Sequence, residues 1–159
     1  MVLIIISGVG GFWLIDEYVK PDPPHHKAVA HEPICIDSND DFDGSHGVTG
    51  GSGTKDDPWI IRNWKIDGEG RNHCIYIGNT TDHFVIKNCY LQGADRRIDW
   101  DPLTTRDMNA GIVLYRVQNG VVKNTTVRDN SMHGIYLGYS DYNTVHDCDI
   151  NNNTEHGVF

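Results

Sequence analysis

The sequence has few basic residues, no helical periodicity after residue 60 and no long hydrophobic segment, and each absence argues against a class of protein. Its 13 Lys and Arg residues are outnumbered by 22 Asp and Glu residues, so the net charge is −9. This charge repels phosphate backbones, which argues against a nucleic-acid partner. After residue 60 no segment carries apolar residues at positions i, i+3, i+4 and i+7. Helices are therefore not expected there.

The four cysteines lack the spacing of a zinc site, because Cys35, Cys74, Cys89 and Cys148 form no C-x-x-C pair. Cys89 and Cys148 share one register of the repeat described below, with Thr125 between them. They would then stand about two strand spacings apart, beyond the reach of a disulfide. We expect buried free thiols.

What the sequence does contain is an internal repeat. Gly111, Gly134 and Gly157 follow one another at intervals of 23 residues, and the residues after them alternate between aliphatic and other side chains. This period of two is typical of strands. A second register has an aliphatic residue two positions before and three positions after each member: Asn63, Asn88, Asn124 and Asp147.

A unit of this length, without helices, predicts an all-β solenoid with three short strands and three bends per turn. Equivalent strands would stack about 4.8 Å apart in parallel sheets. The aligned aliphatic residues would form buried ladders, each side chain contributing roughly 1.5–3 kcal/mol. Asn63, Asn88, Asn124 and Asp147 would form a structural polar ladder at one corner. We expect about four rungs.

Residues 47–61, G-V-T-G-G-S-G-T-K-D-D-P-W-I-I, and the rungs that follow resemble right-handed parallel β-helix proteins of the NosD-like group. Those proteins are classed with carbohydrate-binding and sugar-hydrolase β-helix domains, and many are exported or surface proteins of archaea and bacteria. The resemblance extends over about residues 33–159. It implies a right-handed parallel β-helix, but it leaves the function open because the fold serves enzymes, adhesins and metal-delivery proteins.

Three segments are expected along the chain. Residues 1–15 are apolar, but the run is shorter than the ~20 residues that span a bilayer. We interpret it as an export segment or a membrane anchor through residues 2–15, the alternative being a strand that caps the solenoid. Residues 16–33 contain Pro and His and are expected to form a linker. Residues 34–159 are expected to form the β-helix.

The interval from Asn88 to Asn124 is 36 residues, and the excess over one repeat falls in an insertion at residues 94–108. Mixed charges around a tryptophan suit sugar recognition, because a ring can stack on the sugar while charged groups bind hydroxyls. The alternative is a salt-bridged loop. The candidate carbohydrate-binding residues are Asp95, Arg96, Arg97, Asp99, Trp100, Asp101 and Arg106.

Two groups of residues raise the question of metals, although we expect no cofactor. The Asp-rich run at residues 37–43 is either a calcium site or a solvated acidic loop. His133 and His156 should stack on consecutive rungs, with Met132 beside them, and could share a copper ion. The alternative is exposed turn histidines.

The rungs show no matched acid pair for glycoside hydrolysis, so no catalytic residue is assigned. The chain is interpreted as an extracytoplasmic or surface module that binds carbohydrate or another cell-surface component. One alternative is a fragment of a polysaccharide lyase or hydrolase, and another is a NosD-like copper accessory protein. The residues after Gly157 begin a rung without a C-terminal cap, so we expect either a fragment of a longer β-helix, which is the favoured interpretation, or self-association through that end.

Overall fold

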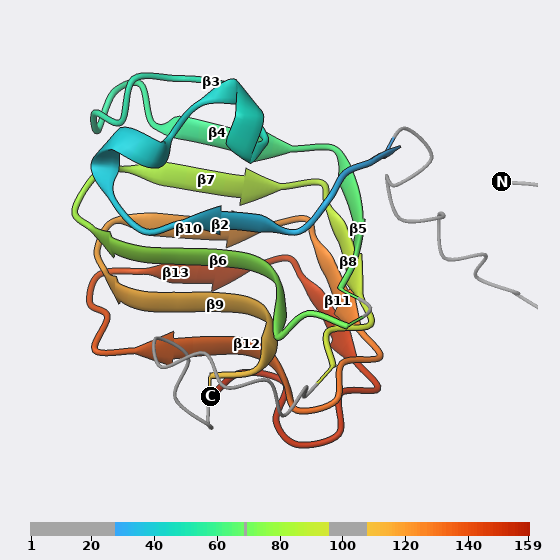
Figure 1. The fold of residues 1–159 in the computed structure, drawn as a ribbon. Helices are drawn as coiled ribbons and strands as arrows, with labels where there is room; N and C mark the ends of the chain where they lie inside the picture. Colours follow the sequence, from blue (N-terminus) through green and yellow to red (C-terminus); the bar gives the residue numbers. More distant parts are fainter. Residues whose placement is uncertain (1–27, 69, 96–107) are drawn as a thin grey trace, which may run out of the picture.

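The chain folds as a parallel β-helix, which the computed structural model describes for residues 28–68, 70–95 and 108–159 (Figure 1). Sheet A contains β1 (Val29–Ala30), β5 (Trp64–Asp67), β8 (Tyr90–Gln92), β11 (Thr126–Arg128) and β14 (Asp149–Asn151). Sheet B contains β2 (Ile34–Ile36), β6 (His73–Thr80), β9 (Ala110–Val117) and β12 (His133–Gly138). Sheet C contains β3 (Val48–Gly50), β4 (Trp59–Arg62), β7 (Phe84–Lys87), β10 (Gly120–Lys123) and β13 (Thr144–His146).

Each turn of the coil runs from sheet C to sheet A and then to sheet B. Three full turns are β4–β5–β6, β7–β8–β9 and β10–β11–β12, and β13 and β14 begin a fourth. A bridge between Ile135 and Val158 extends that fourth turn to the edge of sheet B. The predicted all-β fold and its number of rungs are confirmed.

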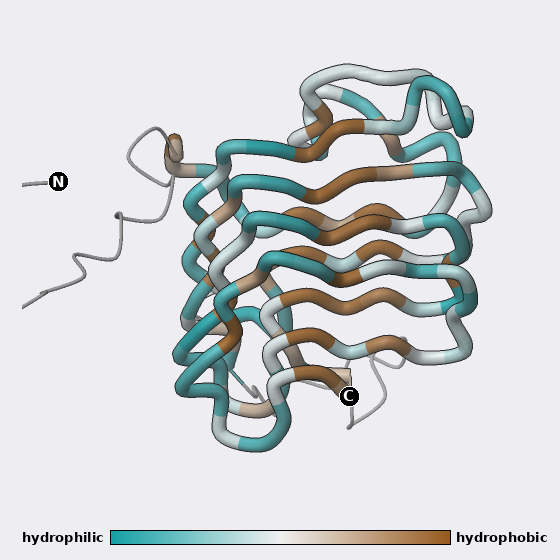
Figure 2. The backbone as a smooth tube through the Cα atoms, turned by 180° about the vertical axis from the view of Figure 1, so that it is seen from behind, coloured by the Kyte–Doolittle hydropathy of each residue, from teal (hydrophilic) through white to brown (hydrophobic). Residues whose placement is uncertain are grey.

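The aliphatic ladders predicted from the repeat line the interior. Ile86 pairs in register with Ile61 and Val122, and Leu91 pairs with Ile66 and Val127. The six side chains are fully buried. Figure 2 shows these apolar segments as brown stretches in the strands, which turn teal toward the corners. The core is therefore one apolar column, closed on three sides by sheets whose register follows the repeat.

The end of the coil next to β4 is covered by residues that the sequence interpretation treated as an acidic loop. This segment forms the short 3-10 helices η2 (Asn39–Asp41) and η3 (Gly44–His46), and then β3, which pairs antiparallel with β4. Phe42 is buried within the segment, stacks on Trp59 at 5.7 Å between ring centroids and lies 6.1 Å from Phe84. The segment is thus an N-terminal cap as well as a carrier of acidic residues, which we did not predict.

The cysteines are free thiols, but not all are buried. Cys74 and Cys89 are buried, Cys148 is half-buried and Cys35 is exposed. The expectation of burial was wrong for Cys35 because this residue lies on the outer side of β2, between the inward Ile34 and Ile36.

Candidate functional site

The insertion predicted at residues 94–108 leaves the coil at the turn between sheet A and sheet B. Ala94 and Met108 are both buried, and Asp95 between them is exposed. These three residues belong to the described part of the chain. The remaining candidate carbohydrate-binding residues, Arg96, Arg97, Asp99, Trp100, Asp101 and Arg106, lie outside the described residues.

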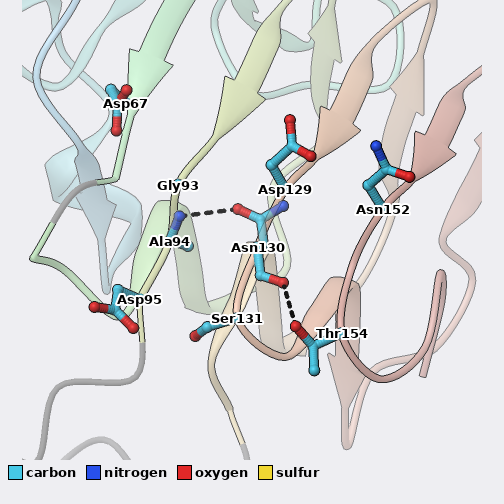
Figure 3. Close-up of a pocket in the computed structure, with 9 residues that line it drawn as sticks. All are labelled: Asp67, Gly93, Ala94, Asp95, Asp129, Asn130, Ser131, Asn152 and Thr154. Carbon is cyan, nitrogen blue, oxygen red and sulfur yellow. Dashed lines mark hydrogen bonds between the residues drawn. The ribbon is translucent and has the colours of Figure 1, made fainter.

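An open hollow of about 470 Å³ lies at this same turn, between the end of sheet A and the start of sheet B. Successive rungs contribute one segment each to its wall, because the turns after β5, β8, β11 and β14 stack along the coil. Figure 3 shows the lining side chains grouped around the turn. The residues are Asp67, Gly93, Ala94, Asp95, Asp129, Asn130, Ser131, Asn152 and Thr154.

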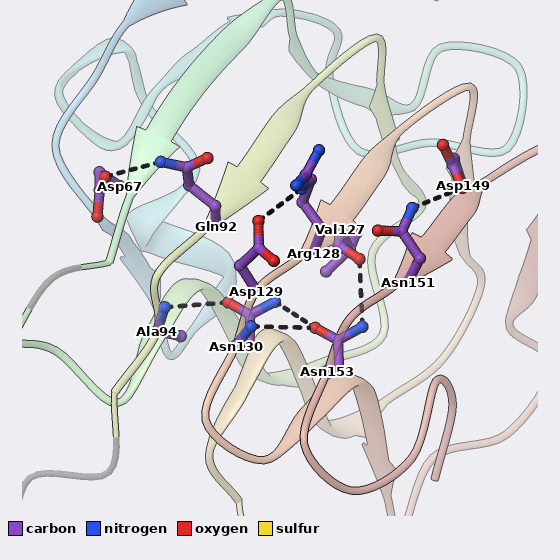
Figure 4. A network of polar contacts seen from close by, with 10 residues as sticks. All are labelled: Asp67, Gln92, Ala94, Val127, Arg128, Asp129, Asn130, Asp149, Asn151 and Asn153. Atoms are coloured by element: carbon purple, nitrogen blue, oxygen red, sulfur yellow. Dashed lines mark hydrogen bonds and ion pairs between the residues drawn. The ribbon is translucent and has the colours of Figure 1, made fainter.

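A pair of asparagines, of which Asn130 is buried and Asn153 half-buried, fixes the wall of the hollow (Figure 4). The side chain of Asn130 is 2% exposed, and its Oδ1 accepts a hydrogen bond of 3.0 Å from the backbone N–H of Ala94. Its Nδ2 donates to Oδ1 of Asn153 at 2.8 Å, and Asn153 Nδ2 donates to the carbonyl of Val127 at 3.2 Å. Three rungs are joined in this way at the point where the insertion begins.

The carboxylates at the rim are oriented by neighbours from their own sheet. Gln92 Nε2 donates to Asp67 at 3.0 Å. Arg128 Nε donates to Asp129 at 2.6 Å, and this bond raises the pKa of the Arg128 side chain, so the guanidinium stays charged. Asp129 itself has a left-handed backbone with φ of 55°, which places its side chain at the corner. The described residues that line the hollow thus present carboxylate and amide acceptors.

The buried thiol beside this turn is not a nucleophile. Cys74 Sγ donates to the carbonyl of Gln92 at 3.1 Å. Burial, with a smaller contribution from Asp67, raises the pKa of the Cys74 thiol to about 12. The thiol therefore stays protonated at neutral pH.

The predicted polar ladder occupies the opposite corner, between sheets C and A. Asn63, Asn88, Asn124 and Asp147 all have positive φ, from 47° to 61°, which explains why Asn and Asp recur there. Asn88 Nδ2 donates to Asn63 Oδ1 at 3.4 Å. Asn124 is exposed. The hydrogen-bonded amide pair of Asn130 and Asn153 was missed, although the 23-residue repeat aligns these two residues.

The candidate metal residues are brought partly together. Nδ1 of His133 lies 3.3 Å from Nδ1 of His156, and the rings are 5.2 Å apart between centroids. Ala110 separates His133 from His73 in the ladder. Met132 precedes His133 and is half-buried.

No group of three or more His, Cys, Asp or Glu residues is placed to hold a metal ion within residues 28–68, 70–95 and 108–159. In the Asp-rich run, Asp43 instead caps η3, accepting from Ser45 and His46. These bonds lower the pKa of Asp43 to about 2. Asp41 is likewise engaged, accepting from the backbone of Asp37 at 3.0 Å.

The outer face of sheet B carries an aromatic column that sequence reasoning also missed. Tyr76, Val113 and Tyr136 are aligned in register, and Tyr115 lies nearby. Met108, the last residue of the insertion, packs against this cluster. The alignment of Tyr76 with Tyr136 could have been found from the repeat.

The segments expected at residues 1–15 and 16–27 lie outside the described residues, as does any anchor through residues 2–15. Within the part of the chain that is described, there is no helix with the length and apolar character needed to cross a bilayer.

Comparison with known proteins identifies the fold family. The model of a family described as "Right handed beta helix region" matches residues 47–159. Among curated proteins and solved structures, none matches the chain.

Proposed function

We propose that this chain, which belongs to the right-handed β-helix family, is a binding module for carbohydrate and that its ligand lies in the hollow between sheets A and B. The observation that carries the proposal is the position of the hollow. It lies at the turn where the insertion at residues 94–108 interrupts the repeat, and Ala94 and Asp95 at the start of that insertion line it. Loops placed on a rigid scaffold carry binding residues more often than the scaffold itself does.

The chemistry of the wall suits hydroxyl groups. Asp95 and Asp129 are exposed acceptors, and Asn152 and Thr154 add an amide and a hydroxyl from the next rung. Carboxylates and amides can accept hydrogen bonds from adjacent sugar hydroxyls, and charge-assisted bonds of this kind are the stronger ones. The rungs are spaced at about 4.8 Å, so the acceptors repeat along the coil. A polymer chain lying across the turns would meet similar groups at each step.

The wall is also prepared in advance. Asn130 is held by Ala94 on one side and Asn153 on the other, so the turns do not need to order when a ligand arrives. A preformed site loses less conformational entropy on binding. The aromatic column at Tyr76 and Tyr136, next to Met108, offers ring faces beyond the insertion.

The test is a glycan array probed with the full chain, followed by titration of the best neutral glycan. We expect Asp95→Ala and Asp129→Asn together to weaken binding by at least about tenfold, since each removes a charged acceptor. Asp40→Asn and Asp56→Asn are the control, because Asp40 is exposed in the N-terminal cap, Asp56 is exposed between β3 and β4, and neither lines the hollow. Trp100→Ala tests the insertion separately. Unchanged glycan binding by the Asp95→Ala, Asp129→Asn variant would contradict the proposal.

An enzymatic role is the second candidate, and one observation favours it. Asp67, Asp95 and Asp129 line a single hollow. Glycoside hydrolysis needs a pair of carboxyl groups, one on each side of the glycosidic bond, and these three residues are the candidates for such a pair. A polysaccharide lyase or hydrolase would release reducing sugar ends from its polymer. The assay is calibrated with a known hydrolase. This role is excluded if the wild-type protein binds a glycan but produces no new reducing ends.

A NosD-like role in copper handling is the third candidate. The two ring nitrogens of His133 and His156 are 3.3 Å apart, a separation suited to two imidazoles on one tetrahedral ion with bonds of about 2.0 Å. Met132 could supply a soft third ligand. Purified chain is expected to retain one equivalent of copper if this role holds, and His156→Ala should abolish retention. Wild-type chain that retains no copper would exclude it.

We place the protein outside the cytoplasm, at the cell surface or secreted. The support is the apolar run at residues 2–15 together with the proposed ligand class. A reporter fused after residue 30 is expected to leave the cytoplasm, and a reporter that stays there would contradict this location.

A further inference from the structure

One column of cations on sheet C stands apart from the other charges of the coil. Arg62, Lys87, Lys123 and His146 are aligned by strand register, each at the last position of its strand. Neighbouring members are therefore separated by one strand spacing of about 4.8 Å. We call Arg62, Lys87 and Lys123 the basic ladder, because His146 is already paired with Asp147 at 2.7 Å.

The basic ladder has no anionic partner within the described chain. Arg62, Lys87 and Lys123 make no ion pair, side-chain hydrogen bond or ring contact with another described residue. Arg62 is exposed, and the two lysines are half-buried. Like charges that face one another across neighbouring strands repel, so the column weakens the sheet that carries it.

The other cations on the strands are all engaged. Lys65 lies over the Tyr90 ring at 6.0 Å, Arg116 lies over the Tyr115 ring at 5.2 Å, and Arg128 pairs with Asp129. The chain also has a surplus of carboxylates, with 22 acidic against 13 basic residues. The lack of ion pairs at Arg62, Lys87 and Lys123 is therefore not due to a shortage of acidic residues in the sequence.

The strands of sheet C, which carry the basic ladder, have no acidic residue, and Asp147 at the same corner lies on the rung after the ladder, paired with His146. β3, β4, β7, β10 and β13 contain neither Asp nor Glu. Figure 2 shows how the strands of this sheet change from apolar to hydrophilic as they approach the corner, in the same way on successive rungs. Directly after each cation of the ladder comes a corner asparagine: Asn63, Asn88 and Asn124.

We propose that the basic ladder binds a linear acidic polysaccharide that lies along the axis of the coil. Each rung offers one cation for a carboxylate or sulfate and one amide for a hydroxyl, and the pair repeats at every strand spacing. Such a polymer likewise carries an anionic group and hydroxyls at regular intervals, so it neutralises the column rung by rung. This surface lies at the corner between sheets C and A, so the proposal is independent of the hollow between sheets A and B.

A nucleic acid is the less favourable polyanion. Proteins that hold single strands combine a basic groove with aromatic rings on which the bases stack. The column next to the basic ladder on the same face is aliphatic instead, formed by Ile60, Val85 and Val121. These side chains can pack against the carbon-bound hydrogens of a sugar ring, but they offer no stacking surface for a base.

The experiment measures binding of the full chain to immobilised polygalacturonate, with neutral dextran and an oligothymidylate as the other two probes. Lys87→Gln with Lys123→Gln removes two ladder charges and keeps side chains of similar length. Lys55→Gln with Lys65→Gln is the control for net charge, because these exposed residues lie outside the ladder. We expect the ladder variant to lose at least about tenfold in affinity for polygalacturonate and the control less than about twofold, because salt screens charges that lie more than about 10 Å from the bound polymer.

The ladder variant is not expected to misfold, because it removes repulsion, and its thermal unfolding midpoint should equal or exceed that of the wild type. Asp95→Ala with Asp129→Asn should leave polygalacturonate binding undiminished, which separates this proposal from the one at the hollow. Equal losses in the ladder and control variants would overturn the proposal, as would a wild type that binds dextran as well as polygalacturonate. Tighter binding of oligothymidylate, lost in the ladder variant, would assign the surface to nucleic acid instead.

Discussion

Replacement of Asn130 by Ala tests whether the amide pair of buried Asn130 and half-buried Asn153 holds the hollow and its rungs together. In the variant the backbone N–H of Ala94 would lose its acceptor in a site that is 3% exposed. A buried N–H without a partner costs about 1–3 kcal/mol, and loss of the bond to Asn153 adds about 0.5–1.5 kcal/mol. We expect the free energy of unfolding to fall by about 2–4 kcal/mol. Urea unfolding should show a lower midpoint with an unchanged slope.

The matched control is Asn124→Ala at the other corner. Asn124 is exposed and has a φ of 47°, so Ala there adds backbone strain of about 1 kcal/mol without leaving a buried group unpaired. Asn130 is not among the residues with positive φ, so its replacement reports the hydrogen bonds rather than the backbone. If Asn130→Ala destabilises the fold no more than Asn124→Ala, the amide pair does not have the role assigned to it.

Three further predictions concern the cap and the coil. Phe42→Ala should lower the free energy of unfolding by about 3–5 kcal/mol, since it empties a buried ring site, and a loss under 1 kcal/mol in urea unfolding would contradict the cap. Gly134→Ala would place its Cβ 2.6 Å from the carbonyl oxygen of Gly157, costing about 1–3 kcal/mol, whereas Gly44→Ala enters open space and should be neutral; equal effects would refute the close approach. Because the pKa of Asp43 is lowered from 3.8 to about 2, its contribution to stability should be present above pH 4 and disappear as the pH falls toward 2; an NMR titration midpoint near 4 would contradict this.

The repeat predicted most of the fold because its signals are local and periodic. The aliphatic registers place Ile86 and Leu91 in the interior, and the corner register places Asn88 at a left-handed turn. The antiparallel β3 and the buried Phe42 could not be predicted in the same way, since the cap occurs once and has no second copy to align with. Its burial depends on contacts with Trp59 and Phe84, which lie far along the chain.

The sequence predicted the turn at which the insertion leaves the repeat, but it did not predict the hollow at that turn. The extra residues between Asn88 and Asn124 identified the turn that carries the insertion, and Asp95 does line the hollow there. Asp129 was assigned to no site because an Asn or Asp at a turn looks the same whether it caps backbone, lines a cavity or faces water. The difference between buried Asn130 and exposed Asn124 depends on which side of the chain the interior lies, and the repeat alone does not give that.

The net charge of −9 describes the whole chain, but a ligand responds to charges within about 8–10 Å of it at physiological salt. On that scale the two corners of the coil differ in sign. The turn between sheets A and B presents Asp95 and Asp129, whereas the corner between sheets C and A presents Lys87 and Lys123 beside asparagines. The net charge therefore argues against a long nucleic-acid duplex, because such a ligand would cover both corners. It does not argue against a single flexible polyanion confined to one column, because strand register aligns Arg62, Lys87 and Lys123 there, and Asp147 enters this corner only on the next rung, where it pairs with His146.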